Sequence, residues 1–153
     1  MVRLLGILGV MLGLLLSGCA SPPPARALAW SFQDQPGEGP KLAYGTPASD
    51  NVMLLMMCRP GADRLTVSLL GGSPREGIVL ASGAEQARLG GAPVASPGWG
   101  QTIEAVAHPE IAPLARFART GDLTLVDRGR RVRIDAAPAE LPGVARFFAA
   151  CGA

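Results

Sequence analysis

Residues 52–58 constrain the fold more than any other stretch of the chain. They form a continuous apolar run, Val-Met-Leu-Leu-Met-Met-Cys, between turn-forming segments at 49–51 and 59–63. The run is too short for an ordinary helix. A short apolar run between turns is typical of a central strand that is covered on both faces. We therefore expect a β-sheet built around residues 52–58.

Alternating apolar and polar residues predict further strands along the chain. Residues 65–69 alternate leucine and valine with threonine and serine, which is the pattern of a half-buried strand. Segments rich in glycine and proline, at 33–40 and 90–100, are expected to be loops. The other expected strands are at 42–45, 78–81, 85–89, 102–107, 123–126 and 131–134.

Two segments follow a helical period instead. A short helix is expected near 112–119, because Pro113 suits a first turn and Gly121 can end the helix in a left-handed conformation. A C-terminal helix is expected near 142–150, with an apolar stripe formed by Val144, Phe147, Phe148 and Cys151. The predicted fold class is α+β, mainly antiparallel β, arranged as a sandwich or half-barrel.

The N-terminal segment has the layout of an export signal. Arg3 provides a positive charge, residues 4–16 are apolar and uncharged, and two small residues follow. The apolar part is shorter than the roughly 20 residues that a membrane-spanning helix needs. The motif Leu16-Ser17-Gly18-Cys19 resembles the lipobox of bacterial lipoproteins. The alternative is an ordinary signal peptide with an incidental cysteine.

The lipobox resemblance implies a thioether-linked diacylglycerol on Cys19, cleavage before that residue and acylation of the new amino group. Residues 1–18 would then be the signal peptide, and 19–29 the lipidated cysteine with a proline-rich tether. Residues 30–153 would form a single β-rich periplasmic domain. Ala20 stands where a retention aspartate would, which implies a lipid anchor at the periplasmic face of the outer membrane.

Lipidation of Cys19 would leave Cys58 and Cys151 as a pair. An even pair of cysteines in an oxidising compartment is expected to form a disulfide. This bond would attach the C-terminal helix to the end of the apolar strand. The alternative is two free thiols.

Composition and motifs argue against several kinds of function. The formal net charge is only +2, without the basic footprint of a nucleic-acid-binding protein. His108 has no Gly-x-Ser-x-Gly nucleophile motif to join it in catalysis. Met53 and Met57 are expected on one face of their strand and Met56 on the other. We expect these methionines to pack in the core and not to bind copper. We predict no catalytic residue, no metal and no cofactor.

Four residues are candidates for contact with a partner. Arg131 and Arg133 share one face of a predicted hairpin and could meet an acidic protein, a lipid headgroup or a glycan, although a solvated sheet face is the alternative. Trp99 lies in a glycine-flanked loop, where it could be an exposed anchor or fold back over the core. The fourth candidate, Ser82, depends on a resemblance.

That resemblance is to lysozyme-inhibitor lipoproteins of the MliC type. It is carried by Cys58-Arg59-Pro60-Gly61, the following Leu65-Thr66-Val67, and Ala81-Ser82-Gly83-Ala84. It implies a small all-β barrel in which Ser82 enters the lysozyme cleft, whereas the two helical segments depart from that pattern. The chain is also similar to small secreted proteobacterial proteins with a strand cysteine and a phenylalanine-rich C-terminal helix that ends in cysteine. This second resemblance implies no activity.

The expected function is therefore that of a membrane-anchored envelope lipoprotein acting as a non-enzymatic binding or accessory module. Besides the membrane, its expected partner is an envelope protein or a glycan, and nucleic acid is not expected. The alternatives are a lysozyme-inhibitor-like protein and a small hydrolase or metal-handling protein.

Overall fold

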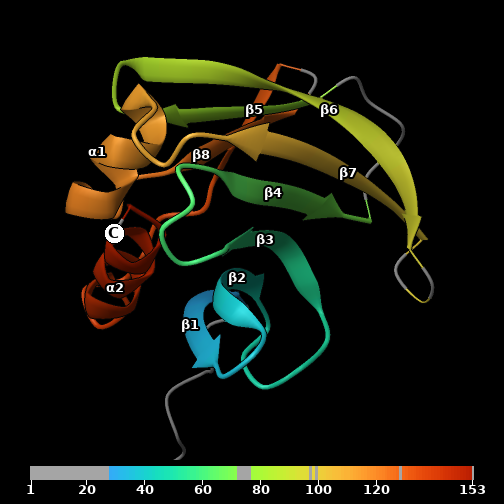
Figure 1. Ribbon diagram of the computed structural model, residues 1–153. Helices are drawn as coiled ribbons and strands as arrows, with labels where there is room; N and C mark the ends of the chain where they lie inside the picture. Colours follow the sequence, from blue (N-terminus) through green and yellow to red (C-terminus); the bar gives the residue numbers. More distant parts are fainter. Residues whose placement is uncertain (1–27, 72–76, 97, 99, 128, 153) are drawn as a thin grey trace, which may run out of the picture.

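The computed structural model describes residues 28–71, 77–96, 98, 100–127 and 129–152 (Figure 1). The predicted signal peptide, Cys19, nearly all of the tether and Trp99 lie outside the described residues. No helix in the described part of the chain is long and apolar enough to cross a membrane.

The strands are β1 (Ala29–Gln35), β2 (Gly39–Gly45), β3 (Val52–Cys58), β4 (Leu65–Leu70), β5 (Gly77–Ser82), β6 (Glu85–Ser96), β7 (Gly100–Ala107), β8 (Thr124–Asp127) and β9 (Arg130–Arg133). The helices are α1 (Ala112–Thr120) and α2 (Leu141–Gly152).

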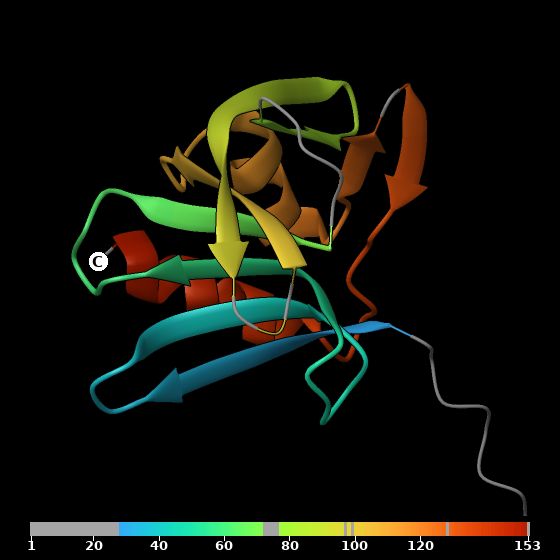
Figure 2. The same cartoon turned by 90° about the vertical axis from the view of Figure 1, so that its right-hand side faces the viewer.

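The strands form one antiparallel sheet in the order β1-β2-β3-β4-β7-β6-β5-β8-β9. The long strand β6 makes the sheet curl, because its first half pairs with β5 and its second half, from Gly91 onward, pairs with β7. In Figure 2 the sheet curls from β1 and β2 at the bottom to β6 at the top, with both helices behind the strands. This arrangement confirms the predicted α+β class, and of the two predicted architectures it is the half-barrel.

The helices α1 and α2 pack side by side on the inner face of the curled sheet. Helix α2 contacts β1 and β2, α1 contacts β5 and β6, and the helices contact each other. The side chains of Phe117 and Phe147 are fully buried there. The indole N–H of Trp30 donates to the Ile134 carbonyl oxygen at 2.6 Å, which links β1 to the residue after β9. The core is therefore closed between the two ends of the sheet.

Both helices begin and end close to the predicted residues. Pro113 lies in the first turn of α1, and Gly121 follows the helix with a φ of 72°. Its N–H donates to the Phe117 carbonyl oxygen, as a left-handed helix end requires. The predicted disulfide between Cys58 and Cys151 is also confirmed, with a Cα–Cα distance of 5.6 Å. It joins the end of β3 to the last turn of α2.

Two expectations about the strands were wrong. Residues 90–96 belong to β6 instead of a loop, because Gly90 and Gly91 allow the strand to bend and change partner. A Cβ on Gly91 would lie 2.6 Å from the Glu104 carbonyl oxygen, so the close approach requires glycine. Likewise β1 continues to Gln35, into the segment expected to be a loop.

A bulge in β3 overturns the expectation that Met53 and Met57 share a face. Tyr44 pairs with Leu54 and Gly45 with Val52, which leaves Met53 as the extra residue. An extra residue in one strand changes the direction of the side chains beside it. Met53 packs against the core, whereas Met57 lies on the other face of the sheet.

Candidate functional site

The face of the sheet opposite α1 and α2 carries mostly small and apolar side chains. The strand register arranges them in three rows, of which the middle row crosses β2, β3, β4, β7 and β6. We call this set the outer-face patch. Its rows are Leu70, Thr102 and Val94; Ala43, Leu55, Ser68, Glu104 and Ala92; and Lys41, Met57, Thr66 and Val106.

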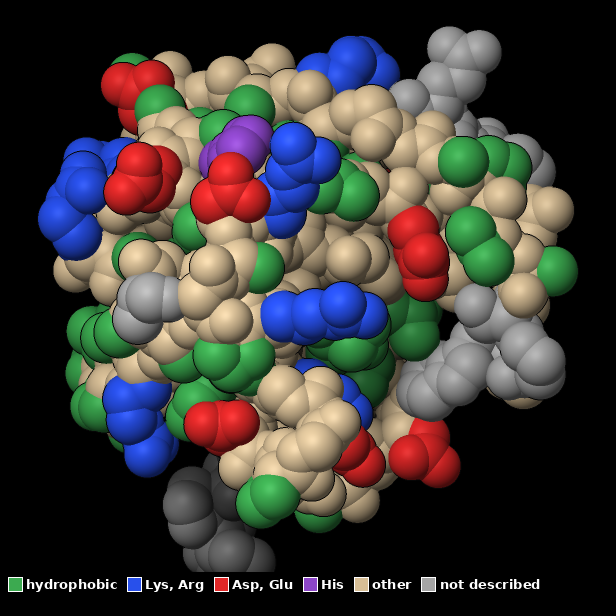
Figure 3. Space-filling model, viewed as in Figure 1, with side chains coloured by type: hydrophobic (Ala, Val, Ile, Leu, Met, Phe, Trp, Pro, Cys, Tyr) green, Lys and Arg blue, Asp and Glu red, His purple; other side chains and the backbone are tan. Residues whose placement is uncertain are grey.

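The outer-face patch exposes large apolar side chains to solvent. Val106 is 60% exposed and Val94 is 39% exposed, and Val132 on β9 is the one other large apolar side chain exposed among the described residues. An antiparallel sheet with one solvated face usually carries polar residues there. Contiguous exposed apolar surface indicates an interaction site. Figure 3 shows apolar side chains exposed over β3 and near the end of β6, with single charged groups between them.

A hollow of about 230 Å³ lies at the centre of the outer-face patch. Ser68 and Thr102 line it, and each residue is only 3% exposed. Their hydroxyl oxygens have no hydrogen-bond partner among the described residues. A buried hydroxyl without a partner costs about 1–3 kcal/mol, so a ligand that bonds to it removes that cost. The full lining is Val52, Leu55, Met57, Ser68, Leu70, Thr102 and Glu104.

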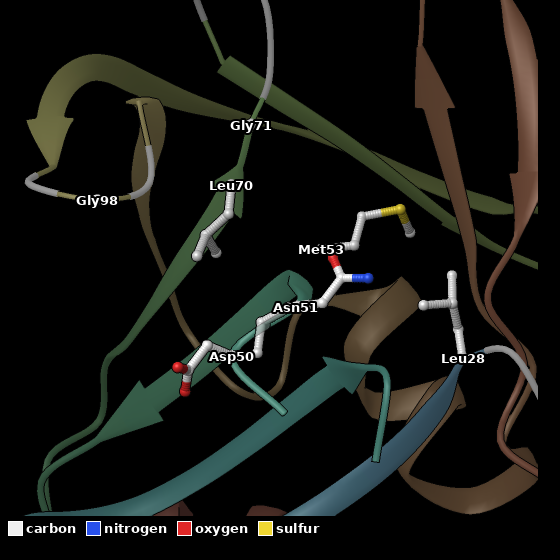
Figure 4. A pocket seen from close by; sticks show the side chains of 8 residues that line it. Leu28, Asp50, Asn51, Met53, Leu70, Gly71 and Gly98 are labelled. Carbon is white, nitrogen blue, oxygen red and sulfur yellow. The ribbon is translucent and has the colours of Figure 1, made fainter. Parts of the chain in front are cut away.

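The hollow is the middle of a longer groove along β3 and β4. It shares Val52 and Leu70 with a depression of about 510 Å³ at one end of these strands. It shares Met57 with a depression of about 480 Å³ at the other end. Figure 4 shows the first depression with Leu70 on one side, Leu28 on the other, and polar residues of the turn before β3 below. The surface can therefore accommodate an extended partner as well as a single side chain.

Ser82 is buried at the end of β5, with only 2% of its surface exposed. The Arg116 side chain of α1 lies against the neighbouring Gly83, where a Cβ would come within 2.6 Å of the Arg116 Nε. Contact between Ser82 and a partner would require the residues that bury Ser82 to move. The lysozyme-cleft role of Ser82 thus stays a prediction that this conformation does not favour.

Arg131 and Arg133 are both exposed on β9. The Arg133 Nε donates to the Asp135 carboxylate at 2.7 Å, and the same carboxylate accepts a bond from the Leu123 N–H at 3.1 Å. Arg133 therefore helps to hold the end of the β8–β9 hairpin. Neither arginine belongs to the outer-face patch, and their contact with a partner stays a prediction.

His108, the only histidine in the sequence, lies near an acidic side chain. His108 Nδ1 lies 3.8 Å from the Asp63 carboxylate, and both side chains are exposed. Among the described residues no group of three or more His, Cys, Asp or Glu could hold a metal ion. The outer-face patch supplies one carboxylate and several hydroxyls, which can form hydrogen bonds with a ligand.

The sequence predictions did not identify the outer-face patch. Val106 was the available signal, because it lies at an outward position of its predicted strand, on the same side as Thr102 and Glu104. An outward valine by itself is ordinary, since much protein surface is apolar. The patch becomes visible only when five strands place such residues side by side.

Comparison of the chain with protein-family models, with curated proteins and with solved structures finds no match.

Proposed function

We propose that this protein is a membrane-anchored envelope lipoprotein whose folded domain is a non-enzymatic binding module. The observation that carries the binding role is the outer-face patch, where exposed Val94 and Val106 flank a hollow containing two buried hydroxyls without partners. Apolar surface around a few polar groups is the composition of a protein-binding site. The partner we propose is another envelope protein.

The anchor is proposed from the lipobox and its surroundings. The motif ending at Cys19 and the proline-rich segment after it match a lipid anchor with a spacer. The Cys58–Cys151 bond supports an oxidising compartment, since disulfides are rare in the reducing cytosol. The proposed location is the periplasmic face of the outer membrane.

Site-specific photo-crosslinking tests the binding surface. A photoreactive phenylalanine replaces Val94 in one bacterial strain and Val132 in a second strain. Val132 is the matched control because its side chain is 42% exposed and that of Val94 is 39% exposed. We expect a discrete crosslinked partner from position 94 and none from position 132. Val106→Glu should abolish the crosslink without preventing disulfide formation. The same crosslinks from both positions, or insensitivity to Val106→Glu, would contradict the proposal.

Metabolic labelling with radioactive palmitate tests the anchor separately. The full-length protein should become labelled and sediment with membranes, whereas Cys19→Ala should do neither. A Cys58→Ala, Cys151→Ala double variant is the matched control, because it removes cysteines outside the lipobox and should keep the label. Label retained by Cys19→Ala would rule out the lipoprotein assignment.

A further inference from the structure

We propose that the hollow in the outer-face patch binds a lysine side chain of the partner protein. This inference rests on the proposed binding role of the patch and names the group that the partner inserts. It depends on the chemistry of three neighbouring residues, Ser68, Thr102 and Glu104, which all line the hollow.

These three residues match the hydrogen-bonding needs of an ammonium group. Ser68 is directly opposite Glu104 across β4 and β7, and Thr102 is two residues before Glu104 on the same face. Two hydroxyl oxygens and a carboxylate can each accept a hydrogen bond, and a lysine ammonium carries three donors and no acceptor. Glu104 is exposed and makes no ion pair with another described residue, so its charge is available.

The walls of the hollow suit the aliphatic part of a lysine. Leu55, Met57 and Leu70 are half-buried around the two hydroxyls. A lysine buries its methylene chain against apolar surface and directs its charged end to polar groups. The hydroxyl oxygens are buried, and the flexible Met57 side chain at the same hollow can rotate to admit the ligand. The cation would then satisfy two buried hydroxyls and the carboxylate together.

Other ligands fit the hollow less well. An anion would face Glu104, and none of the lining residues is basic. A divalent cation prefers several charged oxygen ligands, whereas the lining offers a single carboxylate. Lys41 from a second copy of the chain is the internal competitor, but its Nζ already pairs with Glu38. A lysine from a different protein is therefore the occupant that the charges favour.

Titration of the full chain, followed by NMR of the backbone amides, tests the inference directly. The probes are N-acetyl-lysine methylamide and N-acetyl-norleucine methylamide, which share the aliphatic chain but differ in the ammonium group. We expect the lysine probe to shift the amide signals of Ser68, Thr102 and Glu104, with a Kd lower than that of norleucine by at least about fivefold. Equal affinities for the two probes would overturn the inference.

Variants locate the effect at the carboxylate. Glu104→Gln should remove the preference for lysine, whereas Glu85→Gln should keep it, because Glu85 is exposed on β6 outside the patch. Wild-type preference in Glu104→Gln would also overturn the inference. Loss of the preference for lysine in both variants would overturn the inference too, because Glu85 lies outside the hollow.

Two further measurements separate a protein lysine from other sources of a cation. Phosphatidylethanolamine vesicles that bind the protein through Glu104 would indicate a lipid amine and contradict the inference. A dimer in sedimentation that disappears in Lys41→Ala would indicate a second copy and also contradict it. The crosslink from position 94 distinguishes the two proposals. If this crosslink forms while the protein binds the lysine and norleucine probes equally, the binding surface stands and the lysine site does not.

Discussion

Both faces of strands β3, β4 and β7 carry large apolar side chains, but the buried side chains of the inner face are all apolar, whereas the outer face also holds Ser68, Thr102 and Glu104. On the inner face Leu54, Val67 and Ile103 are fully buried, in the same core cluster as aromatic residues of α1 and α2. On the outer face Val106 is 60% exposed, and no helix in the described part of the chain covers it. Inner-face burial therefore contributes to stability, whereas outer-face apolar surface remains available for binding. The following predictions test this division.

The disulfide should show the largest effect on stability. Cys58 and Cys151 are separated by 93 residues, and closing a loop of this length stabilises the fold by about 4–5 kcal/mol in the chain-entropy model. The double variant Cys58→Ala, Cys151→Ala should lower the free energy of unfolding by up to this amount in urea titrations. An unchanged unfolding midpoint would show that α2 is held on the inner face without the bond.

A core aromatic residue should have an effect nearly as large. Phe117 of α1 is fully buried, and its ring centre lies 5.0 Å from that of Trp30. Phe117→Ala should cost about 3–5 kcal/mol, because it removes this contact and leaves a cavity. Thermal unfolding followed by circular dichroism measures the loss. The exposed Ala145 of α2 offers a control, since Ala145→Ser should leave stability nearly unchanged.

Two adjacent methionines of β3 allow the two faces of the sheet to be compared within one strand. Met56 is fully buried on the inner face, whereas Met57 is half-buried on the outer face. Met56→Ala should cost about 2–5 kcal/mol and Met57→Ala about 1 kcal/mol. In the photo-crosslinking assay only Met57→Ala should weaken the crosslink from position 94. Equal losses of stability would mean that the outer face is also structural core.

The smallest expected effect concerns a hydroxyl in the hollow. Ser68→Ala removes a buried group without a partner, so stability should stay unchanged or rise by up to about 1 kcal/mol. Ser49→Ala is the control, because the Ser49 hydroxyl donates to the Thr46 carbonyl oxygen at 3.0 Å and its loss should destabilise slightly. Urea unfolding of both variants checks the prediction. Destabilisation by Ser68→Ala that exceeds the control would indicate that the hydroxyl has a partner in solution.

Several features were predictable from the sequence because their causes are local. Pro113 and Gly121 mark the ends of α1 through their own backbone preferences. The apolar stripe of α2 identifies the face that must be buried, and Cys151 lies on that stripe. The pairing of Cys58 with Cys151 followed from the assignment of Cys19 to lipidation.

Other features depend on segments that are distant in the sequence. Ser82 is only 2% exposed, and beside it the Arg116 side chain of a later helix lies against Gly83. Met53 points to the core because β2 and β3 are joined with a bulge. Gly90 and Gly91 continue a strand because β5 and β7 pair with its two halves. Turn-forming residues and the alternation of apolar and polar residues do not show which strands pair or where a bulge lies.

Local sequence signals predicted the apolar strand at 52–58 and the approximate ends of both helices, and the lipobox resemblance led to the prediction that Cys58 pairs with Cys151. Which apolar residues remain uncovered depends on how the strands and helices are arranged in space. Both helices pack on one face, and the register aligns Leu70, Val94 and Val106 with two buried hydroxyls on the other. The physical reason is that burial belongs to the arrangement of strands and helices, whereas hydrophobicity belongs to each side chain.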